Sequence, residues 1–302
     1  MNDLDRRQLL GLTGSLCLAP GVAGRFVAPA PVRGARVKLE KSLGIGMIAE
    51  GASLADKFLI AAEIGFDGVE LYSPADFTTE EVLAAKEKSG LEVSNVIDSV
   101  HWETTLGDPD PAVRARGRAG LEMALSDCKA WGGSSVLLVP AVVNQGIAYD
   151  QAYACSQAEI RRVLPLAEEL GVPIAIENVW NHFLLSPLEA ARYVDELASA
   201  RVGWHMDVGN VVNYGWPEQW IRVLGRRILC LHVKEFSRKK RDDEGLWKGF
   251  DVELGEGDCD WPAVTQALAE IGYSGWAVAE VGGGDRARLR DVHARMQRIL
   301  GG

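Results

Sequence analysis

The 302 residues of the chain include 42 acidic and 32 basic side chains, giving a net charge of −10. This negative charge argues against a nucleic-acid partner, because phosphate backbones select basic surfaces. With 47% hydrophobic and 25% charged residues, the composition is that of a globular protein, with room for one barrel-sized domain and an N-terminal extension. The five cysteines form no CxxC pair and show no disulfide-like spacing, so we interpret them as mostly buried small hydrophobes.

Residues 1–36 are predicted to be an export signal and a flexible N-terminal segment. Arg6 and Arg7 precede a short apolar run that contains glycines and is followed by small residues, a pattern that resembles a twin-arginine signal. Such a signal would deliver the folded protein to the periplasm, and an ordinary cytoplasmic N-terminus is the alternative. The apolar run is too short and too rich in glycine for a stable membrane span.

From residue 38 onward, strand-like and helix-like segments alternate with short connections, as in βα units of a parallel sheet. The predicted strands cover residues 43–49, 67–73, 91–98, 134–141, 172–178, 202–207, 228–236 and 275–281. The predicted helices cover residues 53–65, 78–90, 111–131, 149–170, 185–199, 216–225, 260–272 and 285–300, and the longest loop covers 237–258. Eight strands and eight helices predict an α/β fold, a single (β/α)₈ TIM barrel over residues 37–302, with no second domain.

Four successive predicted strands each carry, at or near their C-terminal ends, a side chain that can bind a metal: Glu177, Asp207, His232 and Glu280. The C-terminal ends of parallel barrel strands meet at one rim, and side chains two residues apart share a strand face. Any one of these residues alone could be a solvated polar group at a strand end. Four of them on consecutive strands predict a divalent-metal site.

The segments around these residues resemble a known family. They are GFDGVEL (65–71), IEN (176–178), HMDVGN (205–210), HVKEF (232–236), LGEGDCDW (254–261) and GYSGWAVAEV (272–281). Together they are similar to the xylose-isomerase-like sugar phosphate isomerase and epimerase superfamily, with ketose 3-epimerases and L-ribulose-5-phosphate 3-epimerases as the nearest types. The resemblance extends over about residues 43–300 and implies a metal-dependent isomerase with a carbohydrate substrate.

The resemblance also implies roles for individual residues. One divalent metal would be held by Glu177, Asp207, His232 and Glu280, with manganese as the first expectation and cobalt, magnesium or zinc as alternatives. Glu177 and Glu280 would be the catalytic base and acid. The residue types suit a reaction that removes a proton next to a carbonyl, because a hard cation stabilises the resulting enediolate.

We therefore expect a divalent-metal-dependent epimerase or isomerase that acts on a ketose or keto-sugar. A lyase or dehydratase of a keto-sugar or keto-inositol would begin with the same proton abstraction and stays open as an alternative. A metallo-phosphodiesterase resembling endonuclease IV is less favoured, because that chemistry uses a histidine-rich multi-metal cluster and the chain has only five histidines. A non-catalytic sugar-binding barrel has no need for two glutamates on one metal.

Four further residues are predicted to bind the substrate. His101 and Trp102 follow the third predicted strand at the same rim, where an aromatic face suits a sugar ring. Asn210 stands where several relatives carry a histidine, and Lys234 is the next inward-facing residue after the metal-binding histidine on its strand. His205 lies one layer deeper and is expected to be a core histidine with satisfied hydrogen bonds. Whether the chain forms a homo-oligomer is left open.

The sequence also bears on whether the substrate carries a phosphate group. The glycines of residues 282–284 could form an anion-binding nest before Asp285, although Asp285 is also an ordinary helix N-cap. The basic residues 238–241 are followed directly by acidic ones, which favours a solvated loop of mixed charge. An exported protein would rarely meet phosphorylated sugars, so we expect a non-phosphorylated sugar, keto-sugar or polyol derivative.

Overall fold

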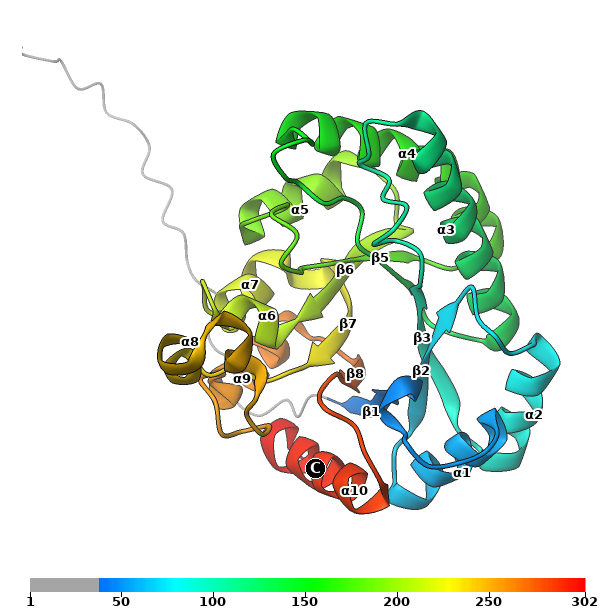
Figure 1. The fold of residues 1–302 in the computed structure, drawn as a ribbon, viewed down its shortest axis with the longest axis vertical. Helices are drawn as coiled ribbons and strands as arrows, with labels where there is room; N and C mark the ends of the chain where they lie inside the picture. The colour runs from blue at the N-terminus through cyan, green and yellow to red at the C-terminus, as the bar shows by residue number, and fades with distance from the viewer. Residues whose placement is uncertain (1–37, 302) are drawn as a thin grey trace, which may run out of the picture. The chain divides into compact units, whose positions relative to one another are not determined.

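The structure, a computed structural model, describes residues 38–301, and the predicted export signal lies outside them. Eight parallel strands pair in sequence order and close into a barrel through hydrogen bonds between the first and the last strand, with helices packed around them (Figure 1). The single (β/α)₈ barrel predicted from the sequence is confirmed. Within residues 38–301, no helix has the length and apolar character that crossing a membrane would require.

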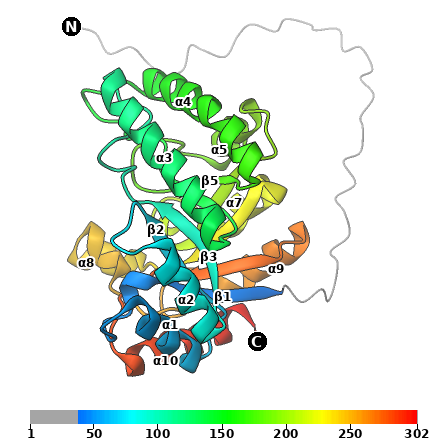
Figure 2. The same cartoon turned by 90° about the vertical axis from the view of Figure 1, so that its right-hand side faces the viewer.

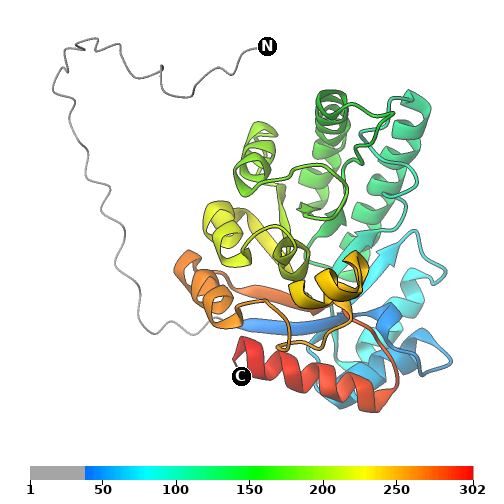
Figure 3. The ribbon, with the colours of Figure 1, turned by 60° about the vertical axis from the view of Figure 1, so that its left-hand side comes forward.

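The strands are β1 (Leu39–Gly44), β2 (Gly68–Ser73), β3 (Glu92–Asp98), β4 (Val136–Leu138), β5 (Ile174–Glu177), β6 (Val202–Asp207), β7 (Ile228–Val233) and β8 (Gly275–Ala279). The helices are α1 (Leu54–Ile64), α2 (Thr79–Ser89), α3 (Pro111–Trp131), α4 (Tyr149–Leu170), α5 (Pro187–Glu196), α6 (Val208–Val212), α7 (Pro217–Leu224), α8 (Arg238–Glu244), α9 (Trp261–Ile271) and α10 (Arg286–Leu300). The long helices α3 and α4 lie side by side (Figure 2), and α9 and α10 lie next to each other near β8 and β1 (Figure 3).

Local sequence signals set the helix boundaries. Ser53 and Thr78 cap α1 and α2 through capping boxes, in which the N-cap hydroxyl and a carboxylate three residues later bond each other's backbone N–H groups. Gly65 ends α1 with a φ of 108°, in the left-handed region that glycine adopts without a steric penalty. These starts and stops agree with the predicted helices to within a residue or two.

Three segments differ from the prediction. Residues Val208–Val212, for which no helix was predicted, form the short helix α6 directly after β6. The first strand covers Leu39–Gly44 rather than 43–49, because backbone pairing with β2 and β8 runs through residues 39–44 and the apolar run continues as a 3-10 helix, Ile45–Met47. The predicted long loop after β7 contains α8 and a second 3-10 helix, Leu246–Phe250. The hydroxyl of Ser237 caps α8, and oppositely charged side chains four residues apart pair along it, so its mixed charge supports a helix.

Successive side chains along a strand point alternately toward the surrounding helices and into the barrel. Trp204 is fully buried and faces the helices, with its ring centroid 6.4 Å from that of Trp220 on α7. The next residue, His205, points into the barrel, where its ring centroid lies 4.1 Å from that of His232. Polar side chains can therefore form a column inside the barrel that leads to the C-terminal rim.

The buried carboxyl group of Asp98, at the end of β3, gives a stability prediction. The side chain is 1% exposed, and only one of its oxygens accepts a hydrogen bond, from the Val100 N–H at 3.3 Å. Burial raises the pKa of Asp98 from 3.8 to about 7, against the smaller opposing effect of the Val100 N–H. Between these two pH values, Asp98 keeps its proton in the folded protein and has released it in the unfolded chain. We expect the contribution of Asp98 to the free energy of unfolding to fall by up to about 4 kcal/mol as the pH rises from about 4 to about 7.

Chemical denaturation of the wild type and of Asp98→Asn at several pH values measures this effect. The asparagine variant cannot ionise at this position, so its stability should change less with pH across the same range. Asp150→Asn, which changes an exposed aspartate on α4, is the control and should keep the wild-type dependence. Equal pH dependence in Asp98→Asn and the wild type would contradict the assignment.

Candidate metal centre

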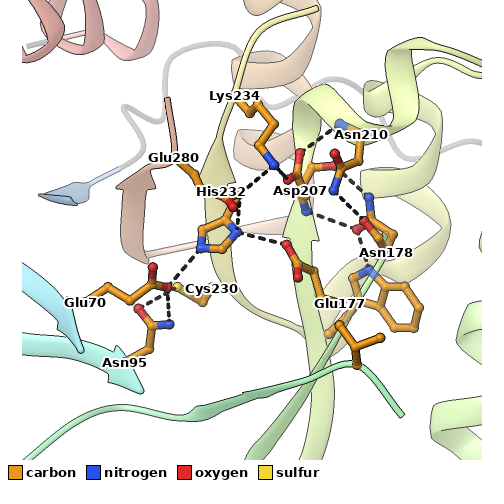
Figure 4. Close-up of polar contacts among 12 residues, drawn as sticks. Glu70, Asn95, Glu177, Asn178, Asp207, Asn210, Cys230, His232, Lys234 and Glu280 are labelled. Carbon is orange, nitrogen blue, oxygen red and sulfur yellow. Dashed lines mark hydrogen bonds and ion pairs between the residues drawn. The ribbon is translucent and has the colours of Figure 1, made fainter. Parts of the chain in front are cut away.

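The four predicted ligands converge at the C-terminal ends of β5 to β8 (Figure 4). Each of Glu177, Asp207, His232 and Glu280 offers one ligand atom, and these four atoms all lie within 4.8 Å of one another. Nδ1 of His232 lies 2.9 Å from Oε1 of Glu177 and 3.0 Å from Oε2 of Glu280. We call these four residues the quartet, and the structure brings them together as the sequence predicted.

Strand register and a helix cap position the quartet. Asp207 pairs with His232 across β6 and β7, and the Glu280 N–H donates to the Val233 carbonyl at 3.2 Å, which continues the sheet past the end of β8. Asp207 also caps α6, because its Oδ1 accepts the Asn210 N–H at 2.8 Å. One carboxylate oxygen of Asp207 is therefore fixed by the backbone, and the other, Oδ2, faces the quartet.

Asn178, the residue after Glu177, ties the ends of β5 and β6 together. Its amide nitrogen donates to the Asp207 carbonyl at 2.7 Å, and its amide oxygen accepts the Asp207 N–H and the Trp204 indole N–H, each at 3.0 Å. Sequence reasoning missed this role, although the asparagine in the IEN segment was a usable signal. Fixing the backbone of Asp207 on both sides holds its carboxylate at the quartet.

A carboxylate below the quartet orients the histidine. Oε2 of Glu70 lies 2.9 Å from Nε2 of His232 and accepts the Asn95 amide N–H at 2.6 Å, and Glu70 is 2% exposed. A proton on Nε2 donates to Glu70 and leaves the Nδ1 lone pair free for a cation on the quartet side. Sequence reasoning missed Glu70 and Asn95. The signal was an acidic residue inside the otherwise apolar strand GVELY.

The carboxylates of the quartet and the cationic groups beside them, His232 and Lys234, shift one another's pKa values. Burial raises the pKa of Glu177 to about 7, although His232 opposes the rise. Burial also tends to raise the pKa of Glu280, but His232 and Lys234 outweigh it and hold this pKa well below its usual range. For His232, burial favours the neutral ring, but the carboxylates of Glu280 and Glu70 prevail and raise its pKa well above the ordinary value. The site therefore favours bound positive charge.

The residues present fit a divalent cation. Oδ2 of Asp207 and Oε2 of Glu280 are buried and accept no hydrogen bond within residues 38–301. Both instead lie close to the Lys234 ammonium, at 2.9 and 2.7 Å. Three carboxylates and one imidazole form a donor set that suits manganese, cobalt or zinc, and its oxygen-rich part suits magnesium.

The predicted substrate-binding residues lie in two places. Lys234 contacts the quartet, whereas the Asn210 amide N–H donates to the Asn178 carbonyl at 3.0 Å and so belongs to the scaffold around Asp207. His101 is buried, its Nδ1 accepts the Val139 N–H at 3.2 Å, and burial lowers its pKa to about 4, which keeps the ring neutral. Trp102 is 52% exposed, with its ring centroid 5.6 Å from that of His101. That these four residues contact the substrate stays a prediction.

His205 differs from the prediction of a satisfied core histidine. The residue is fully buried, but neither ring nitrogen has a hydrogen-bond partner within the described part of the chain. Its ring packs against that of His232, and burial lowers its pKa well below the ordinary value, so the ring is neutral. The error arose because strand periodicity gives the face of a side chain and not its partners.

The glycine-rich turn after β8 does not form the anion nest considered from the sequence. The Gly284 N–H donates to the Met47 carbonyl at 2.9 Å, and the Arg286 N–H donates to Oε1 of Glu50 at 2.9 Å. The Arg288 N–H, in the first turn of α10, donates to Oδ1 of Asp285 at 2.9 Å. Carboxylates of the protein therefore already occupy the start of α10.

Buried Glu235 anchors the LGEGDCDW segment. Its carboxylate accepts the Gly255 N–H at 2.8 Å, the Cys259 N–H at 3.0 Å and the Trp261 indole N–H at 2.8 Å. The segment therefore shapes the loop between β7 and α9.

Comparison with known proteins agrees with this architecture. The sequence profile of a family described as a xylose isomerase-like TIM barrel matches residues 58–299. The L-ribulose-5-phosphate 3-epimerase of Salmonella paratyphi A is 25% identical over 282 residues, which cover 85% of this chain and 96% of that protein.

Solved structures share the fold. A D-psicose 3-epimerase crystallised in the presence of D-fructose matches with a TM-score of 0.71 and 19% identity over 87% of this chain and 100% of its own. The IolI protein with a bound zinc atom matches with a TM-score of 0.72 and 17% identity over 87% of this chain and 98% of its own. The family expected from the sequence motifs is confirmed: the chain belongs to the xylose isomerase-like TIM barrel family.

Proposed function

We propose that the protein is a divalent-metal-dependent sugar epimerase that inverts a carbon next to a carbonyl group in a non-phosphorylated ketose or keto-sugar. The quartet carries this proposal, because it places two glutamates from β5 and β8 around one cation-binding position. The curated relative is named as a 3-epimerase of a ketose phosphate, which supports the isomerase class. The zinc atom named for the IolI structure supports the metal.

Epimerisation requires proton removal from one face of a carbon and proton return to the other face. Glu177 and Glu280 come from the first and last strands of the run β5 to β8, so they reach the position between them from different sides. A carboxylate on each side of the reacting carbon can take a proton from one face and return one to the other. A divalent cation, when bound, would polarise the substrate carbonyl and favour loss of the neighbouring proton.

The pairing of cationic side chains supports a substrate without phosphate. Barrel enzymes commonly bind phosphate with the loops after strands 7 and 8. Every Lys and Arg side chain from residue 234 to 260 and from 280 to 288 contacts an acceptor of the protein itself: Lys234, Arg238, Lys239, Lys240, Arg241, Lys248, Arg286 and Arg288. We also propose export by residues 1–36, which would separate the protein from cytoplasmic sugar phosphates.

Deuterium exchange tests the reaction. The manganese-loaded protein would be incubated in heavy water with a panel of ketoses and keto-sugars and with L-ribulose 5-phosphate, and followed by NMR. We expect deuterium at the carbon next to the carbonyl, together with an epimer, from a non-phosphorylated sugar. Loss of water without an epimer would indicate a lyase, and turnover of the phosphorylated sugar alone would contradict the proposed substrate class.

Elemental analysis tests the metal. We expect about one manganese, cobalt or zinc per wild-type chain after loading, and a loss of most of it in Asp207→Ala, because this change removes an oxygen ligand. Glu103→Ala, at an exposed carboxylate on the loop between β3 and α3, is the control and should keep the metal. Two or more zinc ions per chain would favour the phosphodiesterase, and no metal under any loading condition would refute the proposed dependence.

A further inference from the structure

Three aromatic side chains that no part of the proposed chemistry uses lie beside the quartet. Trp180 follows β5, and Trp247 and Phe250 lie on the 3-10 helix after α8. The centroid of the Trp180 ring is 5.0 Å from that of Trp247 and 4.9 Å from that of Phe250. The three rings are tilted by about 30–40° relative to one another. We call these three residues the aromatic wall.

The aromatic wall is continuous with the metal centre. The Phe250 ring centroid lies 5.5 Å from the Lys234 ammonium, and this ammonium contacts both Asp207 and Glu280. The Trp180 indole N–H donates to the Asn210 carbonyl at 2.9 Å. Trp247 lies farther out, with its centroid 6.4 Å from that of Phe250. A ring bound at the quartet can therefore reach Phe250, and a second ring linked to it can reach Trp247.

Buried residues beneath the aromatic wall hold it in place. Phe236 is fully buried beneath it, with its centroid 4.9 Å from that of Phe250 and 5.7 Å from that of Trp180. Gly249 passes so close that a Cβ atom there would lie 2.3 Å from the Phe236 ring, and its carbonyl accepts the Ser237 N–H at 2.7 Å. The wall is thus a pre-formed surface.

The exposure of Trp247 points to a ligand. This side chain is 68% exposed although it is the largest apolar side chain type, and it lies next to a polar centre that we propose to bind a sugar. The two cations that contact the wall or belong to its 3-10 helix are paired with carboxylates: Lys234 with the quartet, and Lys248 with Asp251 at 2.6 Å. The surface therefore suits an uncharged group with an apolar face.

We propose that the aromatic wall is a subsite for a second ring of the substrate, so that the substrate class is a keto-sugar joined by a glycosidic bond to another ring. The ring with the keto group would lie at the quartet, and the C–H face of the linked ring would pack against Trp247. Ligand pockets commonly combine aromatic walls with a few polar groups that orient the ligand. This inference rests on the proposed function, because it assigns a sugar to the quartet.

A binding comparison tests the subsite. Lactulose, in which a galactose ring is linked to fructose, and D-fructose would be titrated into the metal-loaded full chain by calorimetry. We expect the wild type to bind lactulose about tenfold more tightly than D-fructose, and Trp247→Ala to lose this preference while its affinity for D-fructose is unchanged. Leu246→Ala is the matched control, because Leu246 is 46% exposed on the same 3-10 helix.

The outcomes separate this proposal from the proposed function. A preference for lactulose that is equal in Trp247→Ala and the wild type overturns the subsite. A dimer that sedimentation detects in the wild type and not in Trp247→Ala also overturns it, because the wall would then be an interface between copies. Lactulose binding that depends on Trp247 supports the subsite even if no sugar is epimerised, a result that would refute only the reaction.

Discussion

Glu177→Gln and Glu280→Gln should each lower the rate of epimer formation by about 10²- to 10⁴-fold. An amide cannot take a proton from carbon or return one, whereas its oxygen can still bind a cation. Each glutamate lies within about 3 Å of Nδ1 of His232, so both face the position that we assign to the metal. NMR of the sugar in heavy water measures the rate for each variant.

Metal content decides how a loss of rate is interpreted. Both variants should retain bound metal, so that the lost rate reflects proton transfer and not an empty site. Glu103→Gln, at an exposed carboxylate after β3, should epimerise at the wild-type rate. If either Glu177→Gln or Glu280→Gln forms the epimer at the wild-type rate with its metal bound, that residue is not a catalytic acid or base.

The quartet was predictable because its members follow one rule. Each occurs at or just beyond the end of a buried parallel strand, and strand periodicity aims each side chain into the barrel. Neither the strand end nor the strand face requires knowledge of which residues meet across the barrel. The barrel itself followed from the alternation of strand and helix patterns, and capping residues such as Ser53 and Thr78 set the helix starts.

The supporting residues were not predictable in this way. Glu70 on β2 contacts His232 on β7 across 162 positions of sequence, and this contact depends on how the barrel closes. Trp247 lies in a segment that the sequence predicted to be a loop, so its contact with Trp180 could not be foreseen. The hydrogen bonding of His205 was misjudged for the same reason, because periodicity specifies a face and not a neighbour.

Glu70→Gln should weaken metal binding by about 10- to 100-fold, although Glu70 is not itself predicted to bind the metal. In the wild type, its carboxylate accepts both the Asn95 amide N–H and a proton from Nε2 of His232. Both donors meet the same oxygen, Oε2, so a glutamine whose amide oxygen takes that place keeps both bonds but lacks the negative charge that favours a proton on Nε2 of His232. His232 would then present Nδ1 to the quartet less often, because the tautomer with a proton on Nε2 would no longer be favoured.

Competition with a chelating dye for manganese or zinc measures the affinity of each variant without any need for turnover. Asn95→Leu should give a smaller loss than Glu70→Gln, because it removes a donor to Glu70 and keeps the acceptor for His232. Glu92→Gln, at an exposed carboxylate on β3 that pairs with Lys86, should bind metal as the wild type does. An affinity of Glu70→Gln within about twofold of the wild type would mean that the orientation of His232 is set by the quartet itself, and the column of polar groups below it would then have a structural role alone.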